Sequence, residues 1–282
     1  MLQIMSLMDD RLTGRKDLKA EHGLSMYVAY GEKRLLFDCG SGENTLYNAR
    51  KLGVPLEKLD AVVISHGHYD HAGGYRFLAA HTGAAPVFTG PGFFAPKYSD
   101  RGICFANLSA GFDREYLEER GIAHETVDGC REIFPGMYLI SGFPRTEPLE
   151  TIPKRFLRQT ERGLTQDDFR DELCLALDTA GGLVVLVGCA HPGIVNMAAH
   201  VHRLLDRPVR AVFGGIHLME AEETRVRRTV DTLQAMGVAL LGLSHCSGET
   251  AERLIAEREN GRSCRMGPGD CVFFGDVSEK CL

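Results

Sequence analysis

Residues 64–74, with the sequence ISHGHYDHAGG, concentrate metal-binding residue types between an apolar run and a pair of glycines. Three histidines and one aspartate fall within six positions: His66, His68, Asp70 and His71. Imidazole nitrogens and carboxylate oxygens suit Zn²⁺ and related divalent ions. His66 and His68 are two residues apart, so in an extended segment both side chains point to the same side. Asp70 and His71 follow a bend, where they could bind a second ion beside the first.

Three more histidines stand where an apolar, strand-like run ends. LVVLVGCAHPG contains His191, VRAVFGGIHL contains His217 and ALLGLSHCSG contains His245. In open α/β sheets, ligands bind at the carboxyl ends of the strands, so the loops after these strands can converge on one place. We expect His191 and His245 to be further metal ligands. His217, if it is not a ligand, is placed to bind substrate or to donate a proton to the leaving group.

Cys189 competes with His191 to complete the metal site. A thiolate is a good zinc ligand, and the alternation of a strand gives both residues the same facing, so both could point inwards. By the same alternation Cys246, next to His245, is expected to point the other way. Cys39, in LLFDCGSG, is expected to be a small buried residue.

The remaining histidines are expected to have ordinary surface or packing roles. One precedes a strand, two lie in loops, and two lie in a helix that offers no paired partner. They are His22, His81, His124, His200 and His202.

An anionic small-molecule substrate is expected near the metal. Pro192 suits a first helical position, and SGET at 247–250 suits a helix start. Helix N-termini favour anions. Arg145, in FPRTEP, could bind a phosphate or carboxylate bidentately, although a solvated loop arginine explains it equally well.

Strand-like and helical patterns alternate along the chain, which predicts an α/β fold in a single domain over residues 1–282. Helices are predicted over IVNMAAHVHRLL, EETRVRRTVDTLQAMG and ETAERLIAERE. Residues 141–172 carry three prolines and many charges, and form either a linker or a long surface loop over the site. Short apolar runs predict buried strands: LSMYVAY, KRLLFDC, DAVVIS, APVFTG, GMYLISG, LCLALD, GLVVLVG, VRAVFGG and VALLGLS.

The net charge, the hydropathy and the cysteine content of the 282 residues limit the classes of partner and the compartment that we expect. The formal net charge is −6 and no Lys/Arg cluster stands out, which argues against a nucleic-acid partner. No apolar run approaches the roughly 18 residues that span a bilayer, and no basic leader stands at the start. The nine cysteines are scattered and never spaced C-x-x-C, as expected for free thiols in the cytoplasm. A homo-oligomeric state stays open.

SHGHYDHAGG resembles the H-x-H-x-D-H signature of the metallo-β-lactamase superfamily, whose members are metal-dependent hydrolases with a four-layer αββα sandwich. One branch is especially similar: the archaeal dihydropterin ribofuranosyl-aminobenzene phosphate synthases and their uncharacterised bacterial relatives. The similar blocks cover nearly the whole chain in order: EHGLSMYV, LLFDCGSG, SHGHYDHAGG, GFPRTEPLE, GLVVLVGCAHPGIVN, GGIHL and SHCSG.

The resemblance implies a two-metal site and also shows two departures from it. It implies that His66 and His68 hold the first metal, and that Asp70, His71 and His245 hold the second. Most relatives place a third first-site histidine where this chain has TQDDFRDE, which contains no histidine. Most relatives also end the VVLVG strand in Gly-Asp, with the Asp bridging both metals, where this chain has Gly-Cys. His191 is the obvious replacement ligand.

Two divalent ions about 3.5–4 Å apart can share a water and lower its pKa towards 7. This makes hydrolysis of an ester, thioester, lactone or phosphoester the expected reaction, with Asp70 and His217 as the expected catalytic residues. Zinc is the expected ion, with manganese and iron as alternatives.

Other functions fit the same residues. The resemblance to the synthases implies an enzyme that acts on a pterin and a phosphorylated aminobenzene riboside. A mono-iron oxygenase on this fold would use two histidines and one carboxylate. A non-catalytic metal-binding sensor would keep the ligands and show no turnover.

Overall fold

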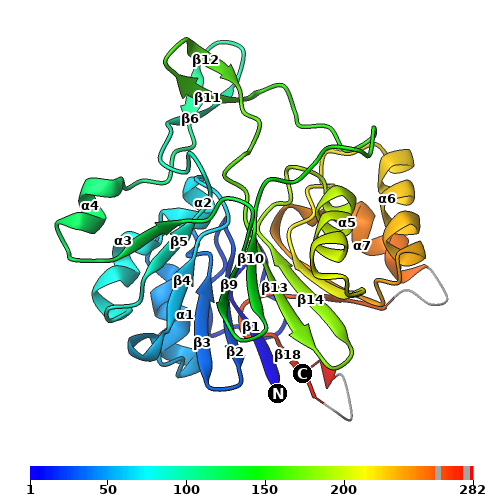
Figure 1. The fold of residues 1–282 in the computed structure, drawn as a ribbon, viewed down its shortest axis with the longest axis horizontal. Helices are drawn as coiled ribbons and strands as arrows, with labels where there is room; N and C mark the ends of the chain where they lie inside the picture. Colours follow the sequence, from blue (N-terminus) through cyan, green and yellow to red (C-terminus); the bar gives the residue numbers. More distant parts are fainter. Residues whose placement is uncertain (258–261, 276–279, 282) are drawn as a thin grey trace.

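A computed structural model describes residues 1–257, 262–275 and 280–281. Two β-sheets face each other in the middle of the molecule, and helices cover the outer face of each sheet (Figure 1). Among the described residues the first sheet has the strand order β19-β18-β1-β2-β3-β4-β5-β8, and the second has the order β17-β16-β15-β14-β13-β10-β9. The predicted four-layer αββα sandwich is therefore confirmed.

The strands of the first sheet are β1 (Leu2–Met8), β2 (Ser25–Tyr30), β3 (Lys33–Phe37), β4 (Ala61–Val63), β5 (Val87–Thr89), β8 (His124–Thr126), β18 (Cys271–Phe274) and β19 (Lys280–Cys281). Those of the second sheet are β9 (Cys130–Phe134), β10 (Met137–Ile140), β13 (Cys174–Thr179), β14 (Gly182–Val187), β15 (Val209–Gly214), β16 (Leu240–Leu243) and β17 (Arg262–Arg265). The α-helices are α1 (Asn44–Leu52), α2 (Tyr69–Ala72), α3 (Tyr75–Leu78), α4 (Arg114–Glu118), α5 (Ile194–Leu205), α6 (Glu223–Ala235) and α7 (Glu249–Ala256), with short 3₁₀ turns η1 (Leu56–Lys58), η2 (Ala79–His81) and η3 (His245–Ser247).

The predicted strand runs each contain a strand, because both faces of these strands are covered and the runs are apolar throughout. In β14, Val185 and Val187 pack against the helices, whereas Val184 and Leu186 pack between the two sheets. Side chains that alternate along a strand thus contribute to two apolar layers. A third apolar layer joins the first sheet to α1 and α3.

The three predicted helices are also present as α5, α6 and α7. The apolar spacing of these segments places Val226, Val230 and Leu233 on one face of α6, and all three are buried. The same spacing places Ile194, Met197, Val201 and Leu204 on one face of α5, but Leu204 is 41% exposed and Leu205 packs against the core instead. The last turn of α5 therefore presents a neighbouring residue to the sheet.

Parallel pairing brings several strand ends to one edge of the sandwich. β14, β15 and β16 are mutually parallel in the second sheet, and β3, β4 and β5 are parallel in the first. β1 and β3 are each antiparallel to β2, so the ends of β1 and β3 lie at the same edge. This edge is at the top of Figure 1 and carries the loops that follow β1, β3, β4, β5, β14, β15 and β16.

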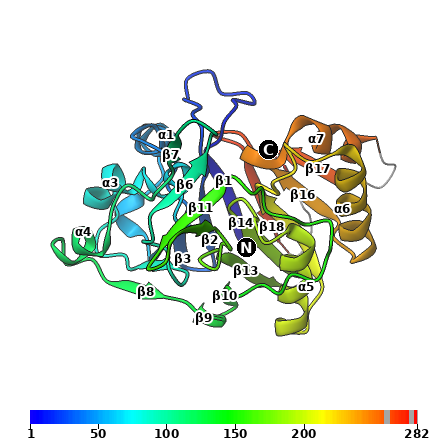
Figure 2. The same ribbon diagram turned by 90° about the horizontal axis from the view of Figure 1, so that it is seen from above.

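A four-stranded sheet, here called the accessory sheet, stands over this edge (Figures 1 and 2). Its strand order is β12-β11-β6-β7, formed by β6 (Lys97–Asp100), β7 (Phe105–Asn107), β11 (Phe156–Thr160) and β12 (Gly163–Gln166). Residues 141–172 are thus a surface segment over the edge and not a linker. The hairpin β11–β12 was not predicted, because its short strands are too polar to show an apolar alternation.

Within the described ranges of the chain, no helix is long and apolar enough to cross a membrane.

Candidate metal centre

The H-x-H-x-D-H loop follows β4 directly, and its ligand-type side chains are all buried: His66, His68, Asp70 and His71. The rings of His66 and His68 have centroids 4.7 Å apart. Gly67 between them is needed for space, because a Cβ there would lie 2.3 Å from the carbonyl oxygen of Phe93. The backbone then enters the short helix α2, which presents Asp70 and His71.

Among the described residues, three groups of candidate ligand atoms lie at the strand ends: one is formed by Asp10, His22 and His245, and the other two share one sulfur. The ligand atoms of His66, Cys189 and His191 lie within 4.8 Å of one another, as do those of His71, Cys189 and His245. Cys189 Sγ lies 3.1 Å from His71 Nε2. The sequence left open whether Cys189 or His191 completes the metal site, and the structure brings both residues to it.

Asp70 lies beside the second group. Its Oδ2 is 3.1 Å from Nε2 of His245 and 3.5 Å from Nε2 of His71. These two imidazoles and the carboxylate come from two different loops, one after β4 and one after β16.

Carboxylates hold the outer nitrogen of three of the imidazoles. Nδ1 of His71 lies 2.6 Å from Asp38, Nδ1 of His191 lies 2.9 Å from Glu172, and Nδ1 of His245 lies 2.6 Å from Asp10. A carboxylate that accepts the Nδ1 proton fixes the tautomer and leaves Nε2 as a lone-pair donor. This is the arrangement by which proteins orient histidine ligands of metals.

Two buried imidazole nitrogens without a hydrogen-bond partner indicate whether a metal ion fits this site. His66 Nε2 and His68 Nε2 are buried and have no hydrogen-bond partner among the described residues. A buried polar atom without a partner is costly and uncommon, and a divalent ion would satisfy both atoms. The residues present therefore fit a metal ion.

Burial keeps the imidazoles of His66, His68 and His191 neutral. Desolvation lowers the pKa of His66, His68 and His191 well below the usual value, and neighbouring imidazoles act in the same direction. The neutral form is the one that binds a metal. Burial also raises the pKa of the Cys189 thiol.

A cavity of about 500 Å³ opens over these ligand atoms. His217, which is 8% exposed, forms part of its wall with its ring centroid 4.7 Å from that of His191. Burial lowers the pKa of His217 to about 4. Phe156 of β11 and the preceding residue Arg155 also line the cavity, so it lies between the sandwich edge and the accessory sheet.

Comparison with known proteins identifies the fold that carries this centre. The family model of the metallo-beta-lactamase superfamily matches residues 18–148. The crystal structure of Tm1679, a metal-dependent hydrolase of the beta-lactamase superfamily, is similar with a TM-score of 0.83 and 28% identity, covering 98% of this chain and 100% of that chain. The chain has the metallo-β-lactamase fold. The resemblance predicted from SHGHYDHAGG is confirmed.

Two curated proteins of Methanocaldococcus jannaschii are also similar to the chain. One is 7,8-dihydropterin-6-methyl-4-(β-D-ribofuranosyl)-aminobenzene-5′-phosphate synthase, 28% identical with 97% of each chain covered. The other is the uncharacterised protein MJ0448, 27% identical, with 88% of this chain and 92% of that protein covered. A diphosphatase of the PhnP family shares the metallo-β-lactamase fold at 12% identity and a TM-score of 0.55, covering 100% of this chain and 98% of that one.

In this metallo-β-lactamase fold, His22 lies at the candidate centre, contrary to the ordinary role predicted for it. Its Nδ1 is 3.1 Å from Asp10, and its Nε2 is 3.5 Å from Asp70. Asp10 thereby contacts both His22 and His245. Asp10 was missed because the apolar run LQIMSLM before it was not recognised as strand β1; with that strand assigned, Asp10 follows a strand end as the other site residues do.

The predicted facing of Cys246 is wrong. Its Sγ lies 3.8 Å from the carbonyl oxygen of Cys189, and the residue lines the cavity. Strand alternation does not apply there, because His245 has a positive φ of 48° and begins the 3₁₀ turn η3. Cys39 is buried in the layer between the first sheet and its helices, as predicted.

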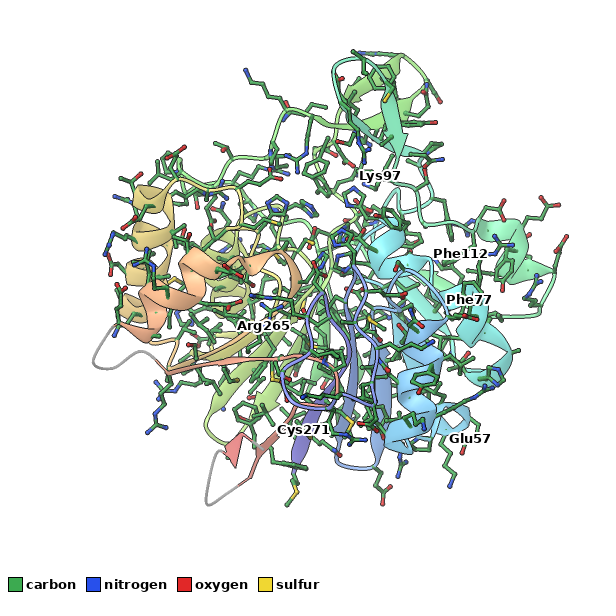
Figure 3. All side chains as sticks on the ribbon, turned by 180° about the vertical axis from the view of Figure 1, so that it is seen from behind. Glu57, Phe77, Lys97, Phe112, Arg265 and Cys271 are labelled. Carbon is green, nitrogen blue, oxygen red and sulfur yellow. The ribbon has the colours of Figure 1, made fainter. Side chains whose placement is uncertain are left out.

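The acidic stretch TQDDFRDE, which lacks the third histidine of most relatives, binds a buried lysine. Lys97 is 1% exposed, and its Nζ lies 2.5 Å from Asp167 and 3.0 Å from Asp171 (Figure 3). Asp171 also accepts a hydrogen bond from the backbone of Gly67 at 2.8 Å. The stretch thus supports the H-x-H-x-D-H loop through the hydrogen bond from Gly67 to Asp171.

Arg145 is not brought into the cavity over the ligand atoms. Its guanidinium donates to the carbonyl oxygen of Asp168, and it lines a separate cavity with Glu150 and Lys154. Arg101 and Arg155 line the cavity at the candidate centre instead.

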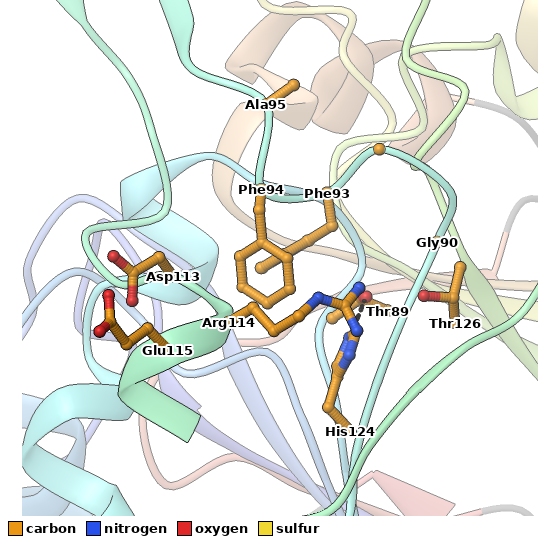
Figure 4. A pocket seen from close by; sticks show the side chains of 11 residues that line it. Thr89, Gly90, Phe93, Phe94, Ala95, Asp113, Arg114, Glu115, His124 and Thr126 are labelled. Carbon is orange, nitrogen blue, oxygen red and sulfur yellow. Dashed lines mark hydrogen bonds between the residues drawn. The ribbon is translucent and has the colours of Figure 1, made fainter. Parts of the chain in front are cut away.

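The other histidines lie elsewhere. His81 contacts Arg50, His124 contacts Thr89, His200 contacts Arg203, and His202 contacts the backbone of Arg207. His124 belongs to a second cavity of about 450 Å³, shown in Figure 4, where Arg114 lies beside Asp113 and Glu115. This mixture of charges favours no class of ligand.

Proposed function

We propose that the protein is a metal-dependent hydrolase that acts on a small anionic ester, such as a phosphoester. The observation that carries the proposal is the shared position of Cys189, which belongs to both groups of ligand atoms. A site with two such groups is suited to two ions. The metallo-β-lactamase fold of a metal-dependent hydrolase, Tm1679, supports the same reading.

The residues divide into two ligand sets. We propose that His66, His68 and His191 would hold one ion, that Asp70, His71 and His245 would hold the other, and that Cys189 contributes to both. Imidazole and thiolate donors favour zinc, with manganese or iron as alternatives. Bound there, the ions would lower the pKa of water and polarise the scissile group.

Two phenylalanine side chains, Phe156 and Phe169, pack against the imidazoles and hold them in place. The ring of Phe169 stacks on that of His191, with centroids 3.7 Å apart and an angle of 11° between the planes. Phe156 lies 5.5 Å from the rings of both His68 and His191. These aromatic rings restrict the imidazoles to one orientation.

The mouth of the cavity is suited to an anion. Arg101 and Arg155 line it, and the imidazole of His217 faces the same space. Arg155 is paired with Glu220 at 2.5 and 2.7 Å, so an anionic substrate would compete with that carboxylate for the guanidinium. We propose that His217 contacts the substrate. Because burial lowers its pKa to about 4, its imidazole is uncharged near neutral pH and is suited to donate a hydrogen bond to the substrate or to accept a proton, and the proton-donor role expected from the sequence is not kept.

The test combines elemental analysis of the purified protein with a panel of phosphodiesters, phosphomonoesters, thioesters and lactones. We expect bound zinc, manganese or iron, and turnover that a chelator removes and the metal restores. The double variant His66→Ala/Asp70→Ala is expected to lose most of its metal and its turnover while it keeps its fold. His202→Ala, on the exposed face of α5, is the matched control. A metal-replete protein inert towards the whole panel would contradict the hydrolase proposal.

A second candidate is a synthase, favoured by the 28% identity to the M. jannaschii synthase over 97% of both chains. The metal-loaded protein would be incubated with a dihydropterin and a ribofuranosyl-aminobenzene phosphate, and the products separated by mass. Formation of a joined product without turnover of any ester would replace the first proposal by this one.

A further inference from the structure

Two cysteines lie against each other at the floor of the cavity. Cys246 Sγ is 3.8 Å from the carbonyl oxygen of Cys189, so the side chain of Cys246 packs directly against Cys189. Both residues line the cavity, although Cys189 is only 3% and Cys246 only 4% exposed. A small solute that enters the cavity therefore meets both sulfurs.

The second sheet creates this pair. Cys189 follows β14 and Cys246 follows β16, while β15 lies between these strands. Gly215, just after β15, leaves the space between them open. A Cβ at Gly215 would lie 2.6 Å from Cys246 Sγ and 3.5 Å from Cys189 Cα. Glycine is thus required where the two cysteines approach.

The sulfur of Cys189 has two competing sets of neighbours. On one side it lies 3.1 Å from His71 Nε2 and belongs to both groups of metal-ligand atoms. On the other side lies Cys246, whose Sγ packs against the backbone of Cys189 and which belongs to neither group. A sulfur bonded to Cys246 would no longer be a thiolate donor to an ion.

We propose that Cys189 and Cys246 are a reversible redox pair, which hydrogen peroxide converts into a disulfide that releases metal from the site. The inference rests on the proposed metal centre. One thiolate attacks a peroxide oxygen, the O–O bond breaks, and a sulfenic acid and hydroxide form. The second thiol sulfur then attacks the sulfenic sulfur, the S–O bond breaks, and the second oxygen leaves as hydroxide. With two protons from the thiols, the products are one disulfide and two waters; the sulfurs lose two electrons and the peroxide gains them.

The test uses the full metal-loaded chain, a small excess of hydrogen peroxide, and two readouts other than activity. A chromogenic chelator measures released metal, and mass mapping of peptides without reduction identifies the disulfide. We expect a cross-link between the peptides containing Cys189 and Cys246, metal release in step with it, and reversal of both by dithiothreitol followed by added metal.

Three variants make the test specific. Cys246→Ser and Cys246→Ala are expected to keep bound metal and to lose both the cross-link and the rapid release. Cys104→Ser, at an exposed cysteine, is the matched control and is expected to respond like the parent protein. Circular dichroism verifies that each variant is folded.

Metal release that is as fast in Cys246→Ser as in the parent would overturn the redox pair, as would oxidation of Cys189 to a sulfinic acid without a cross-link. These failures are distinct from failure of the proposed function. A reduced protein that binds metal and hydrolyses an ester but forms no cross-link would refute the pair alone. A protein that forms the cross-link and releases its metal, yet hydrolyses none of the esters, would refute the hydrolase alone.

Discussion

Asp38 Oδ2 lies 2.6 Å from Nδ1 of His71, and both side chains are fully buried. The same carboxylate accepts hydrogen bonds from the backbone and hydroxyl of Ser65, at 2.7 and 2.8 Å. Asp38 follows β3 and Ser65 follows β4, so this carboxylate links two neighbouring strand ends to one candidate ligand. The orientation of His71 thus depends on the parallel pairing of β3 and β4.

Asp38→Asn is expected to weaken metal binding while the fold is kept. Asn tolerates the positive φ of 59° at this position, but an amide is a poorer acceptor for the Nδ1 proton of His71. Loss of such a partner lowers metal affinity by about 10- to 100-fold. Competition with a chromophoric chelator measures the change. Asp60→Asn, at a partly exposed carboxylate paired with Lys33, is the control. An unchanged affinity in Asp38→Asn would show that the carboxylate does not tune this ligand.

His191→Ala and Cys189→Ala are each expected to lower metal content. Both residues belong to the ligand group that includes His66, so removal of either leaves the first ion with fewer donors. Elemental analysis after gel filtration measures the ions that remain. His200→Ala, on the same helix-containing segment but beside Arg203, is expected to keep the parent's content. The role of His191 would be refuted if His191→Ala kept all its metal while Cys189→Ala lost it.

Lys97→Met is expected to destabilise the fold by about 3–5 kcal/mol, because it leaves the buried Asp167 and Asp171 without their cation. Although burial acts to lower it, these carboxylates raise the pKa of Lys97, so the ammonium stays charged. Urea unfolding measures the loss. Lys33→Met, whose partner Asp60 is partly exposed, is expected to cost less than about 1 kcal/mol. An equal loss of unfolding free energy in Lys97→Met and Lys33→Met would mean that burial of the ion pairs of Lys97 does not increase their contribution to stability.

His124 is expected to make stability depend on pH between about 6.5 and 4. Burial, aided by Arg114, lowers its pKa from 6.5 to about 4 in the folded state. Below pH 6.5 the unfolded chain therefore takes up a proton that the folded chain does not, and stability falls with pH until the folded imidazole is also protonated near pH 4. Urea unfolding at pH 7 and pH 5 measures this loss.

The matched variant is His124→Gln, which cannot titrate and can still contact Thr89. The stability difference between this variant and the parent is expected to shift in favour of the variant at pH 5. A difference that is the same at both pH values would mean that His124 keeps its ordinary pKa.

Local patterns in the sequence were sufficient to predict an α/β fold and much of the candidate centre, whereas the four layers were implied by the resemblance to the metallo-β-lactamase superfamily. Apolar runs such as GLVVLVG must be buried on both faces, which predicts strands inside a covered sheet. The spacing of His66, His68, Asp70 and His71 after such a run places their side chains together through short-range backbone geometry alone. His191 and His245 were found by the same reasoning, because each follows a strand end.

Tertiary structure alone decided which residues join these side chains. Alternation of facing holds inside a strand but fails in the turn after it: His217 and His245 have positive φ values of 46° and 48°, and Cys246 therefore packs against Cys189 although alternation predicts the opposite. Asp10 reaches His245 only because β1 pairs with β2 and β18 within the first sheet. Such contacts depend on the packing of segments that are more than 200 residues apart in the chain, and no local pattern of residue types records that packing.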